Sequence, residues 1–157
     1  HLVYCGGVWI SQDQFITAQH CLEDKIVFRM YGSDEEYFGS KIRDSIDSDL
    51  SLVMSVGVPN HSFVKIGKVD IGESVDIVGH TGGLEYTYMR GEASSYRDYK
   101  GEIYLQVSSL AFFGNSGGGV FHNGELVGIS SVIYGRSPGV MFFSSSFAIE
   151  KFLNGLN

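Results

Sequence analysis

The sequence predicts an all-β fold, in which two antiparallel β-barrels pack together and a short helix ends the chain. Apolar residues recur at period two or in short runs, and turn residues interrupt them about every eight to twelve positions, a spacing typical of sandwiches and barrels. Helical periodicity is confined to the tail, where Phe147, Ile149, Phe152 and Leu153 fall roughly on one face. The length of 157 residues suits one domain or two small barrels packed as one unit.

The N-terminal half is expected to contain short strands, which cover residues 7–10, 15–18, 26–31, 37–42 and 50–56. The stretch Val58-Pro59-Asn60-His61-Ser62 follows them and has the composition of a linker. We therefore expect an N-terminal barrel over residues 1–57, a linker over 58–65 and a C-terminal barrel over 66–157. Such a division leaves a crevice between the barrels, and crevices of this kind commonly hold a functional site.

The C-terminal half is expected to contain further strands, which cover residues 74–79, 89–93, 103–107, 120–122, 126–132 and 140–144. The pattern is clearest where Ile103, Leu105 and Val107 alternate with more polar neighbours. Asn123-Gly124 separates two apolar runs and predicts a tight hairpin, because both residues tolerate positive φ. Residues 147–153 are predicted to form the one helix.

Composition and charge exclude several classes of protein. The formal net charge is −7 and no cluster of Lys or Arg is present, which argues against nucleic-acid binding. No apolar run reaches the roughly 18–20 residues of a membrane-spanning helix. The histidines at 61, 80 and 122 show no spacing typical of a metal site, so neither a metal nor a cofactor is expected.

Three separate segments carry residues suited to nucleophilic hydrolysis, which needs a hydroxyl, an imidazole, a carboxylate and backbone donors. Ser116 lies among glycines at 114 and 117–119, where substrate could approach bare backbone. His20 follows a predicted strand, and Asp49 directly precedes another. Taken singly, these segments are also explained as a flexible loop, a partly buried histidine and a turn aspartate.

In the order His, Asp, Ser, the three segments resemble the chymotrypsin/trypsin family of serine peptidases, especially its short HtrA-like and viral members. The resemblance spans most of the chain and rests on these motifs: Cys5-Gly6-Gly7-Val8-Trp9-Ile10, Thr17-Ala18-Gln19-His20-Cys21, Asp49-Leu50-Ser51-Leu52-Val53, Gly114-Asn115-Ser116-Gly117-Gly118, Gly124-Glu125-Leu126-Val127-Gly128-Ile129 and Ser137-Pro138-Gly139-Val140. It implies a serine endopeptidase that takes a protein or peptide as its substrate.

The resemblance also implies a role for each residue. His20 becomes the general base, Asp49 orients it, and Ser116 is the nucleophile. The backbone N–H groups of Gly114 and Ser116 become the oxyanion hole. Asp44 and Asp47 are close in sequence, but only Asp49 directly precedes the apolar strand, where the family places its aspartate.

Two differences from trypsin refine this expectation. Asn115 stands where trypsin-like zymogens carry the aspartate that pairs with a new N-terminus, so activation by that ion pair is not expected. By analogy with the family, the S1 pocket is formed by a floor and walls that contain no acid, namely Leu110, Ala111, Ser131, Val132, Ile133 and Gly139. An apolar or small P1 side chain is therefore expected.

Cys5 and Cys21 are 16 positions apart. From the residues alone, a disulfide and two free buried thiols are equally compatible with this spacing. The resemblance favours the disulfide, since secreted relatives bridge the histidine loop in this way. A disulfide would indicate a secreted or extracytoplasmic protein, and its absence an intracellular protein derived from a viral polyprotein. The sequence gives no indication of oligomeric state.

A different class of function remains open, namely a catalytically silent protein that binds peptides or proteins on the same fold. The presence of all three catalytic residue types argues against it. An α/β-hydrolase esterase fits less well, because its residues follow the order Ser, Asp, His and its serine precedes a helix.

Overall fold

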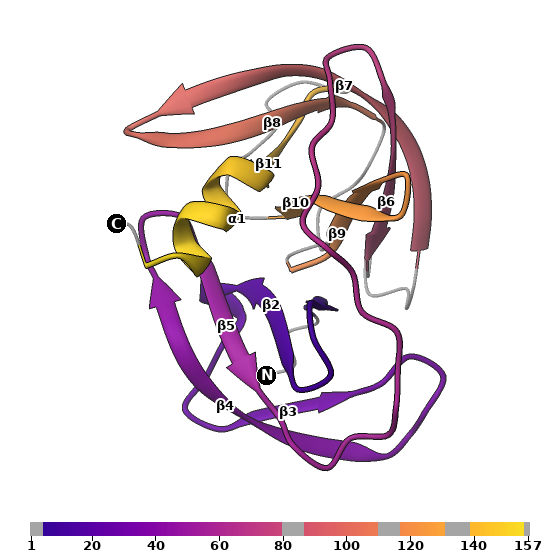
Figure 1. The fold of residues 1–157 in the computed structure, drawn as a ribbon, viewed down its shortest axis with the longest axis vertical. Helices are drawn as coiled ribbons and strands as arrows, with labels where there is room; N and C mark the ends of the chain where they lie inside the picture. Colours follow the sequence, from indigo (N-terminus) through magenta and orange to yellow (C-terminus); the bar gives the residue numbers. More distant parts are fainter. Residues whose placement is uncertain (1–4, 80–86, 110–116, 131–138, 156–157) are drawn as a thin grey trace.

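The computed structural model describes residues 5–79, 87–109, 117–130 and 139–155 (Figure 1). The predicted all-β class is confirmed: two strand-rich units pack together and one helix closes the chain. The N-terminal unit contains β1 (Gly7–Trp9), β2 (Gln14–Ala18), a 3₁₀ turn η1 (Gln19–Cys21), β3 (Ile26–Arg29), β4 (Glu36–Ser45) and β5 (Leu50–Met54). The C-terminal unit contains β6 (Ser74–Gly79), β7 (Thr87–Tyr99), β8 (Glu102–Ser108), β9 (Gly119–His122), β10 (Glu125–Ser130), β11 (Met141–Ser145) and the helix α1 (Ser146–Leu153).

The N-terminal unit is a curled five-stranded antiparallel sheet in the order β1-β2-β5-β4-β3. The sheet curls into a half-barrel that is left open, because within residues 5–57 each of β1 and β3 pairs with one neighbour only. These edge strands have three and four residues, too few to form a long closing ladder. A bulge between Lys41 and Arg43 bends β4, and bulges of this kind increase the local twist of a sheet.

The C-terminal unit is a closed barrel in the order β10-β11-β8-β7-β6-β9, with β9 returning to β10. The predicted hairpin is confirmed: His122 pairs with Glu125, and the two residues between them, Asn123 and Gly124, have φ of 50° and 78°. The barrel interior is filled by buried aliphatic and aromatic side chains, namely Val69, Val75, Ile77, Ala93, Leu105, Val107, Val120, Val127 and Phe143. Exclusion of this apolar surface from water stabilises the barrel.

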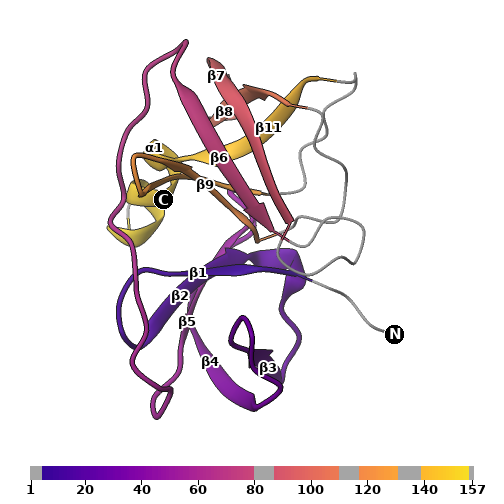
Figure 2. The same ribbon diagram turned by 90° about the vertical axis from the view of Figure 1, so that its right-hand side faces the viewer.

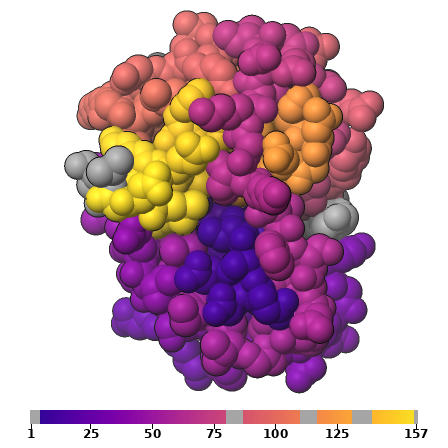
Figure 3. All heavy atoms as spheres, viewed as in Figure 1, coloured from indigo at the N-terminus to yellow at the C-terminus, as the bar shows by residue number. Residues whose placement is uncertain are grey.

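The helix α1 lies between the two units, as Figures 1 and 3 show in yellow. Ser145 caps it, because its hydroxyl accepts a hydrogen bond of 3.3 Å from the amide of Ala148. At the other end, Arg43 Nη1 of β4 donates to the carbonyl oxygens of Phe152, at 2.9 Å, and Leu153, at 3.0 Å. A cation at this end stabilises the exposed carbonyls of the last turn, so the helix is tied to the N-terminal sheet.

A second apolar cluster contains residues of both units. It consists of Val8, Ile16, Leu50 and Leu52 from the N-terminal sheet and Leu126, Ile129, Ile149 and Phe152 from the C-terminal unit. We call this set the shared core. Because its members come from both units, burial of these side chains holds the N-terminal sheet against the C-terminal unit.

The segment between β5 and β6 runs along the outside of both units (Figure 2). It is bonded to each of them: the amide of Val64 donates to Trp9 at 3.0 Å, and the amide of Leu126 donates to Lys65 at 2.8 Å. Residues 58–65 form neither helix nor strand, while the domain limits drawn from the sequence stay a prediction. Within the described ranges, no helix has the length and apolar character needed to cross a membrane.

Candidate active site

His20 and Asp49 are brought together by the pairing of β2 with β5. These strands are antiparallel and Ala18 lies opposite Leu50. His20 is therefore just beyond one end of this ladder, and Asp49 is just before the same end. The backbone amide of Gln19 donates to the carbonyl of Asp49 at 3.0 Å, which holds η1 against the turn before β5.

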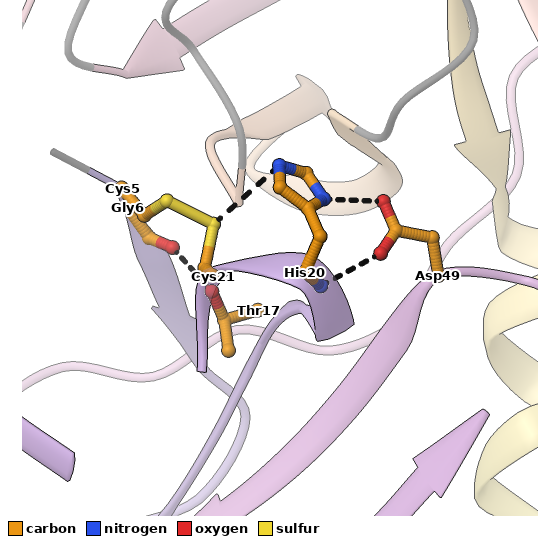
Figure 4. The surroundings of a disulfide bond; sticks show 6 residues. All are labelled: Cys5, Gly6, Thr17, His20, Cys21 and Asp49. Atoms are coloured by element: carbon orange, nitrogen blue, oxygen red, sulfur yellow. Dashed lines mark hydrogen bonds and ion pairs between the residues drawn. A yellow bond between two sulfur atoms is a disulfide. The ribbon is translucent and has the colours of Figure 1, made fainter. Parts of the chain in front are cut away.

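The aspartate holds the histidine at two points, drawn as dashed lines in Figure 4. Asp49 Oδ2 is 2.7 Å from His20 Nδ1, and Asp49 Oδ1 accepts a 2.9 Å hydrogen bond from the backbone amide of His20. A carboxylate at Nδ1 favours the tautomer with the proton on that nitrogen, which leaves the lone pair of the ring on Nε2. The pair thus orients the imidazole and prepares Nε2 to accept a proton.

The surroundings of the two side chains differ. The Asp49 side chain is 13% exposed and the His20 side chain 36% exposed, so the carboxylate is sheltered while the imidazole faces solvent. Asp49 has a φ of 54°, a left-handed conformation that aspartate tolerates better than most residues. The carboxylate of the nearby Asp44 binds other partners: it accepts hydrogen bonds from Ser51 Oγ at 2.7 Å and Lys41 Nζ at 3.2 Å.

Several residues of the predicted site lie outside the described ranges, namely Leu110, Ala111, Gly114, Ser116, Ser131, Val132 and Ile133. Of the predicted S1 residues, Gly139 is described, with a φ of 85°. Its carbonyl accepts a hydrogen bond of 3.3 Å from the amide of Ser109. This bond holds the residue before Leu110 beside the segment that begins at Gly139.

The residues that follow Ser116 are described, and they pack against the N-terminal sheet. Gly117 has a φ of 80°, and a Cβ placed on it would lie 1.9 Å from the carbonyl oxygen of Gly6 and 2.6 Å from Thr17 Oγ1. Thr17 Oγ1 itself donates to the carbonyl of Gly6 at 2.7 Å. The main chain after Ser116 therefore comes against the strand that leads to His20.

This packing has a partner in the C-terminal barrel. The amide of Gly117 donates to the carbonyl of Ser130 at 3.0 Å, and the amide of Ser130 donates to the carbonyl of Gly118 at 2.9 Å. The sequence patterns do not predict the structural role of the Thr17 hydroxyl, which donates to the carbonyl of Gly6. The glycines at 6 and 117 were the available signal, because bare backbone on both sides permits a close approach.

A disulfide joins Cys5 to Cys21, the last residue of η1 (Figure 4). It ties the segment containing Gly6 to the turn that carries His20. Cys21 Sγ lies 3.9 Å from His20 Nε2. The sulfur atoms of Cys5 and Cys21 and a ring nitrogen of His20 all lie within 4.8 Å of one another.

Comparisons with known proteins agree on one family. Residues 5–129 match the family described as the trypsin-like peptidase domain. A protein of Hahella chejuensis, described as a probable periplasmic serine endoprotease that is DegP-like, is 32% identical over 163 residues. That alignment covers 97% of this chain and 34% of the relative, so the chain spans about a third of the length of this relative.

Two solved structures show the same fold. The serine endoprotease from Yersinia pestis superposes with a TM-score of 0.81 at 24% identity, covering 96% of this chain and 56% of that chain. The HtrA-type protease AlgW with a decapeptide gives a TM-score of 0.81 at 21% identity, with coverages of 96% and 51%.

Proposed function

Because the chain belongs to the trypsin-like peptidase domain family, we propose that it is a serine endopeptidase whose catalytic triad is His20, Asp49 and Ser116. One observation carries the proposal: Asp49 holds both the ring and the backbone amide of His20, at 2.7 Å and 2.9 Å. A general base in a serine peptidase needs this arrangement, because a correctly oriented Nε2 must accept the hydroxyl proton.

The proposed reaction is an acyl transfer in two halves. Ser116 Oγ attacks the peptide carbonyl carbon while His20 Nε2 takes the hydroxyl proton, and the N–H groups of Gly114 and Ser116 stabilise the resulting oxyanion. The C–N bond then breaks, and His20 gives its proton to the leaving amine. In the second half, water attacks the acyl-enzyme with His20 again as the base, and Ser116 regains its proton. Throughout, Asp49 holds the His20 ring through Nδ1 and stabilises the imidazolium.

Two features of the described residues support placing Ser116 near His20. The contact of Gly117 with Gly6 and Thr17 brings the residue after Ser116 against the strand that leads to η1. The bonds between Gly117, Gly118 and Ser130 hold the same segment on the C-terminal barrel. The nucleophile is thus expected in the space between the two units, facing a base that belongs to the other unit.

A fluorophosphonate probe tests the proposal directly. We expect the native protein to be labelled covalently at Ser116, because such probes react with serines activated by an adjacent base. Ser116→Ala should abolish labelling. Ser94→Ala, which removes a hydroxyl on β7 that donates to the carbonyl of Glu92, should leave labelling intact. Labelled sites are identified by mass spectrometry of digested peptides. A folded native protein that resists labelling would instead support the alternative function, a catalytically silent protein that binds peptides or proteins.

A panel of peptide substrates tests the proposed S1 pocket. We expect kcat/KM for substrates with alanine, valine or leucine at P1 to exceed that for lysine by at least about tenfold, because an apolar pocket penalises an unpaired charge. Each peptide differs only at P1, and cleavage positions are assigned by mass spectrometry. Best cleavage after lysine, arginine or glutamate would contradict the assignment of Leu110 and Ala111 to the pocket floor.

The comparisons also bear on location and substrate. Relatives are described as periplasmic, and the disulfide Cys5–Cys21 is typical of an oxidising compartment. We therefore propose an extracytoplasmic protein that acts on protein or peptide substrates. The relatives reported above are bacterial, so they give no support to the viral, intracellular alternative.

A further inference from the structure

The disulfide and the proposed general base form a compact group of potential metal ligands. Two sulfur atoms and one imidazole nitrogen, from Cys5, Cys21 and His20, lie within 4.8 Å of one another. We propose that reduction of the disulfide converts this group into a zinc site, and that bound zinc blocks the peptidase. The block of activity rests on the proposed function, whereas the binding of zinc does not.

The distance between Cys21 Sγ and His20 Nε2 suits a tetrahedral ion, and the two sulfurs, which are bonded to each other, must separate after reduction. Zinc binds thiolate sulfur at about 2.3 Å and imidazole nitrogen at about 2.0–2.1 Å, so tetrahedral ligands lie about 3.8 Å apart for two sulfurs and about 3.6 Å apart for sulfur and nitrogen. Cys21 Sγ is already 3.9 Å from His20 Nε2. The Cα atoms of Cys5 and Cys21 are 6.1 Å apart, so rotation about Cα–Cβ can separate the freed sulfurs without moving the backbone far.

Asp49 supports the proposed site by contacting Nδ1, the ring nitrogen of His20 that would not bind the metal. Histidines that bind zinc usually donate their other ring N–H to a carboxylate, which fixes the tautomer and raises the basicity of the ligand nitrogen. The 2.7 Å contact between Asp49 Oδ2 and His20 Nδ1 provides this bond. The feature that prepares Nε2 to accept a proton therefore also prepares it to bind a metal.

Reduction of the Cys5–Cys21 disulfide requires a reductant, and a dithiol can serve. The dithiol transfers two electrons and two protons to the Cys5–Cys21 bond, becomes a disulfide itself and leaves two protein thiols. Zinc then displaces both thiol protons, and Nε2 supplies the third ligand, with the fourth position open to water. The ligands are reachable, because His20 is exposed and both cysteines are partly exposed. With its lone pair on zinc, Nε2 can no longer accept the hydroxyl proton.

Cobalt, used as a spectroscopic substitute for zinc, tests the site without any reference to activity. After reduction of the native chain by a phosphine, one equivalent of Co²⁺ should produce thiolate-to-metal charge-transfer bands and intense d–d bands of tetrahedral geometry. Added Zn²⁺ should abolish both. Oxidised protein should show neither band.

Variants distinguish a folded site from chelation by a disordered chain. His20→Ala should weaken metal affinity at least tenfold, and Asp49→Asn by about 10- to 100-fold, because it alters the partner of the ligand ring. His61→Ala is the matched control and should bind normally, since His61 contacts Gln12 and Ser62 instead. Circular dichroism monitors folding in each state.

Three results would overturn the proposed zinc site. They are the absence of a thiolate–cobalt band in the reduced protein, equal metal affinity in the reduced wild-type and reduced Asp49→Asn proteins, and a reduced chain that stays unfolded with zinc. Activity is a separate readout. Reduced protein should lose peptidase activity on addition of zinc and regain it with a chelator, and reduced protein that cleaves normally with zinc bound would contradict the block. Metal binding in a protein that never cleaves peptides would support the site while refuting the proposed function.

Discussion

Replacing His20 with alanine is expected to lower kcat for a peptide substrate by about 10⁴- to 10⁶-fold, the range found when a triad histidine is removed. The loss is large because no other base would take the proton of Ser116, and the residual rate would come from the oxyanion hole and substrate binding. Stopped or continuous assays on a chromogenic peptide at saturating substrate measure kcat. A loss smaller than about tenfold would refute His20 as general base.

The carboxylate partner provides a matched pair of variants. Asp49→Asn keeps the shape of the side chain but removes the charge that orients the imidazole, and we expect kcat to fall about 10⁴-fold. Asp47→Asn changes a neighbouring acid in the same turn and should leave kcat close to the native value. Equal losses in the two variants would contradict the assignment based on the 2.7 Å contact between His20 and Asp49.

Replacing Gly117 with alanine should lower both the stability and the activity of the protein. The residue has a φ of 80°, and its new methyl group would overlap the backbone oxygen of Gly6 at 1.9 Å. Left-handed conformation and overpacking together should lower the free energy of unfolding by about 2–5 kcal/mol. Displacement of the adjacent Ser116 by about 1 Å should lower kcat by about 10²-fold or more.

Gly124→Ala is the matched control for this effect. Gly124 has nearly the same φ, 78°, but no atom lies within 4 Å of the position a Cβ would occupy. It should therefore lose only the conformational part, about 1–2 kcal/mol, and keep its kcat. Urea unfolding followed by circular dichroism gives the free energies. If both variants lost the same free energy, close packing of Gly117 against Gly6 would not explain the defect.

Much of the fold could be predicted from local patterns. All the expected strands and the helix are present, with the end of the expected strand 126–132 lying outside the described residues. The clearest underestimate is β7, expected over residues 89–93 and found over Thr87–Tyr99. Its second half, from Ser94 to Tyr99, lacks an apolar alternation, and a bulge between Ala93 and Ser95 shifts its register. Lys100 and Gly101, with φ of 53° and 84°, close a hairpin with β8 that the pattern of apolar residues did not reveal.

The candidate site was predictable to the extent that it is local in sequence. The resemblance to the chymotrypsin/trypsin family, which places its aspartate directly before an apolar strand, favoured Asp49 over Asp44. In the structure, Asp49 contacts His20 and Asp44 does not take that place. The contact of Thr17 and Gly6 with Gly117 joins residues about a hundred positions apart, and no spacing within one segment indicates it. Similarly, the proximity of Cys21 Sγ to His20 Nε2 depends on the shape of η1 rather than on the order of residues. Contacts of this kind arise from tertiary packing.

The shared core has a consequence for how the protein loses its structure. Leu50 and Leu52 would be exposed to water if the C-terminal unit dissociated, as would Leu126 and Ile149 if the N-terminal sheet did. Exposing these side chains costs about 1.5–3 kcal/mol each, a large penalty against the usual net stability of a domain. We therefore expect the two units to melt in one cooperative transition, with calorimetric and van't Hoff enthalpies that agree. The proposed catalytic pair, His20 and Asp49, and the segment after Ser116 would then lose their structure together, so no partly folded state would keep one half of the proposed site.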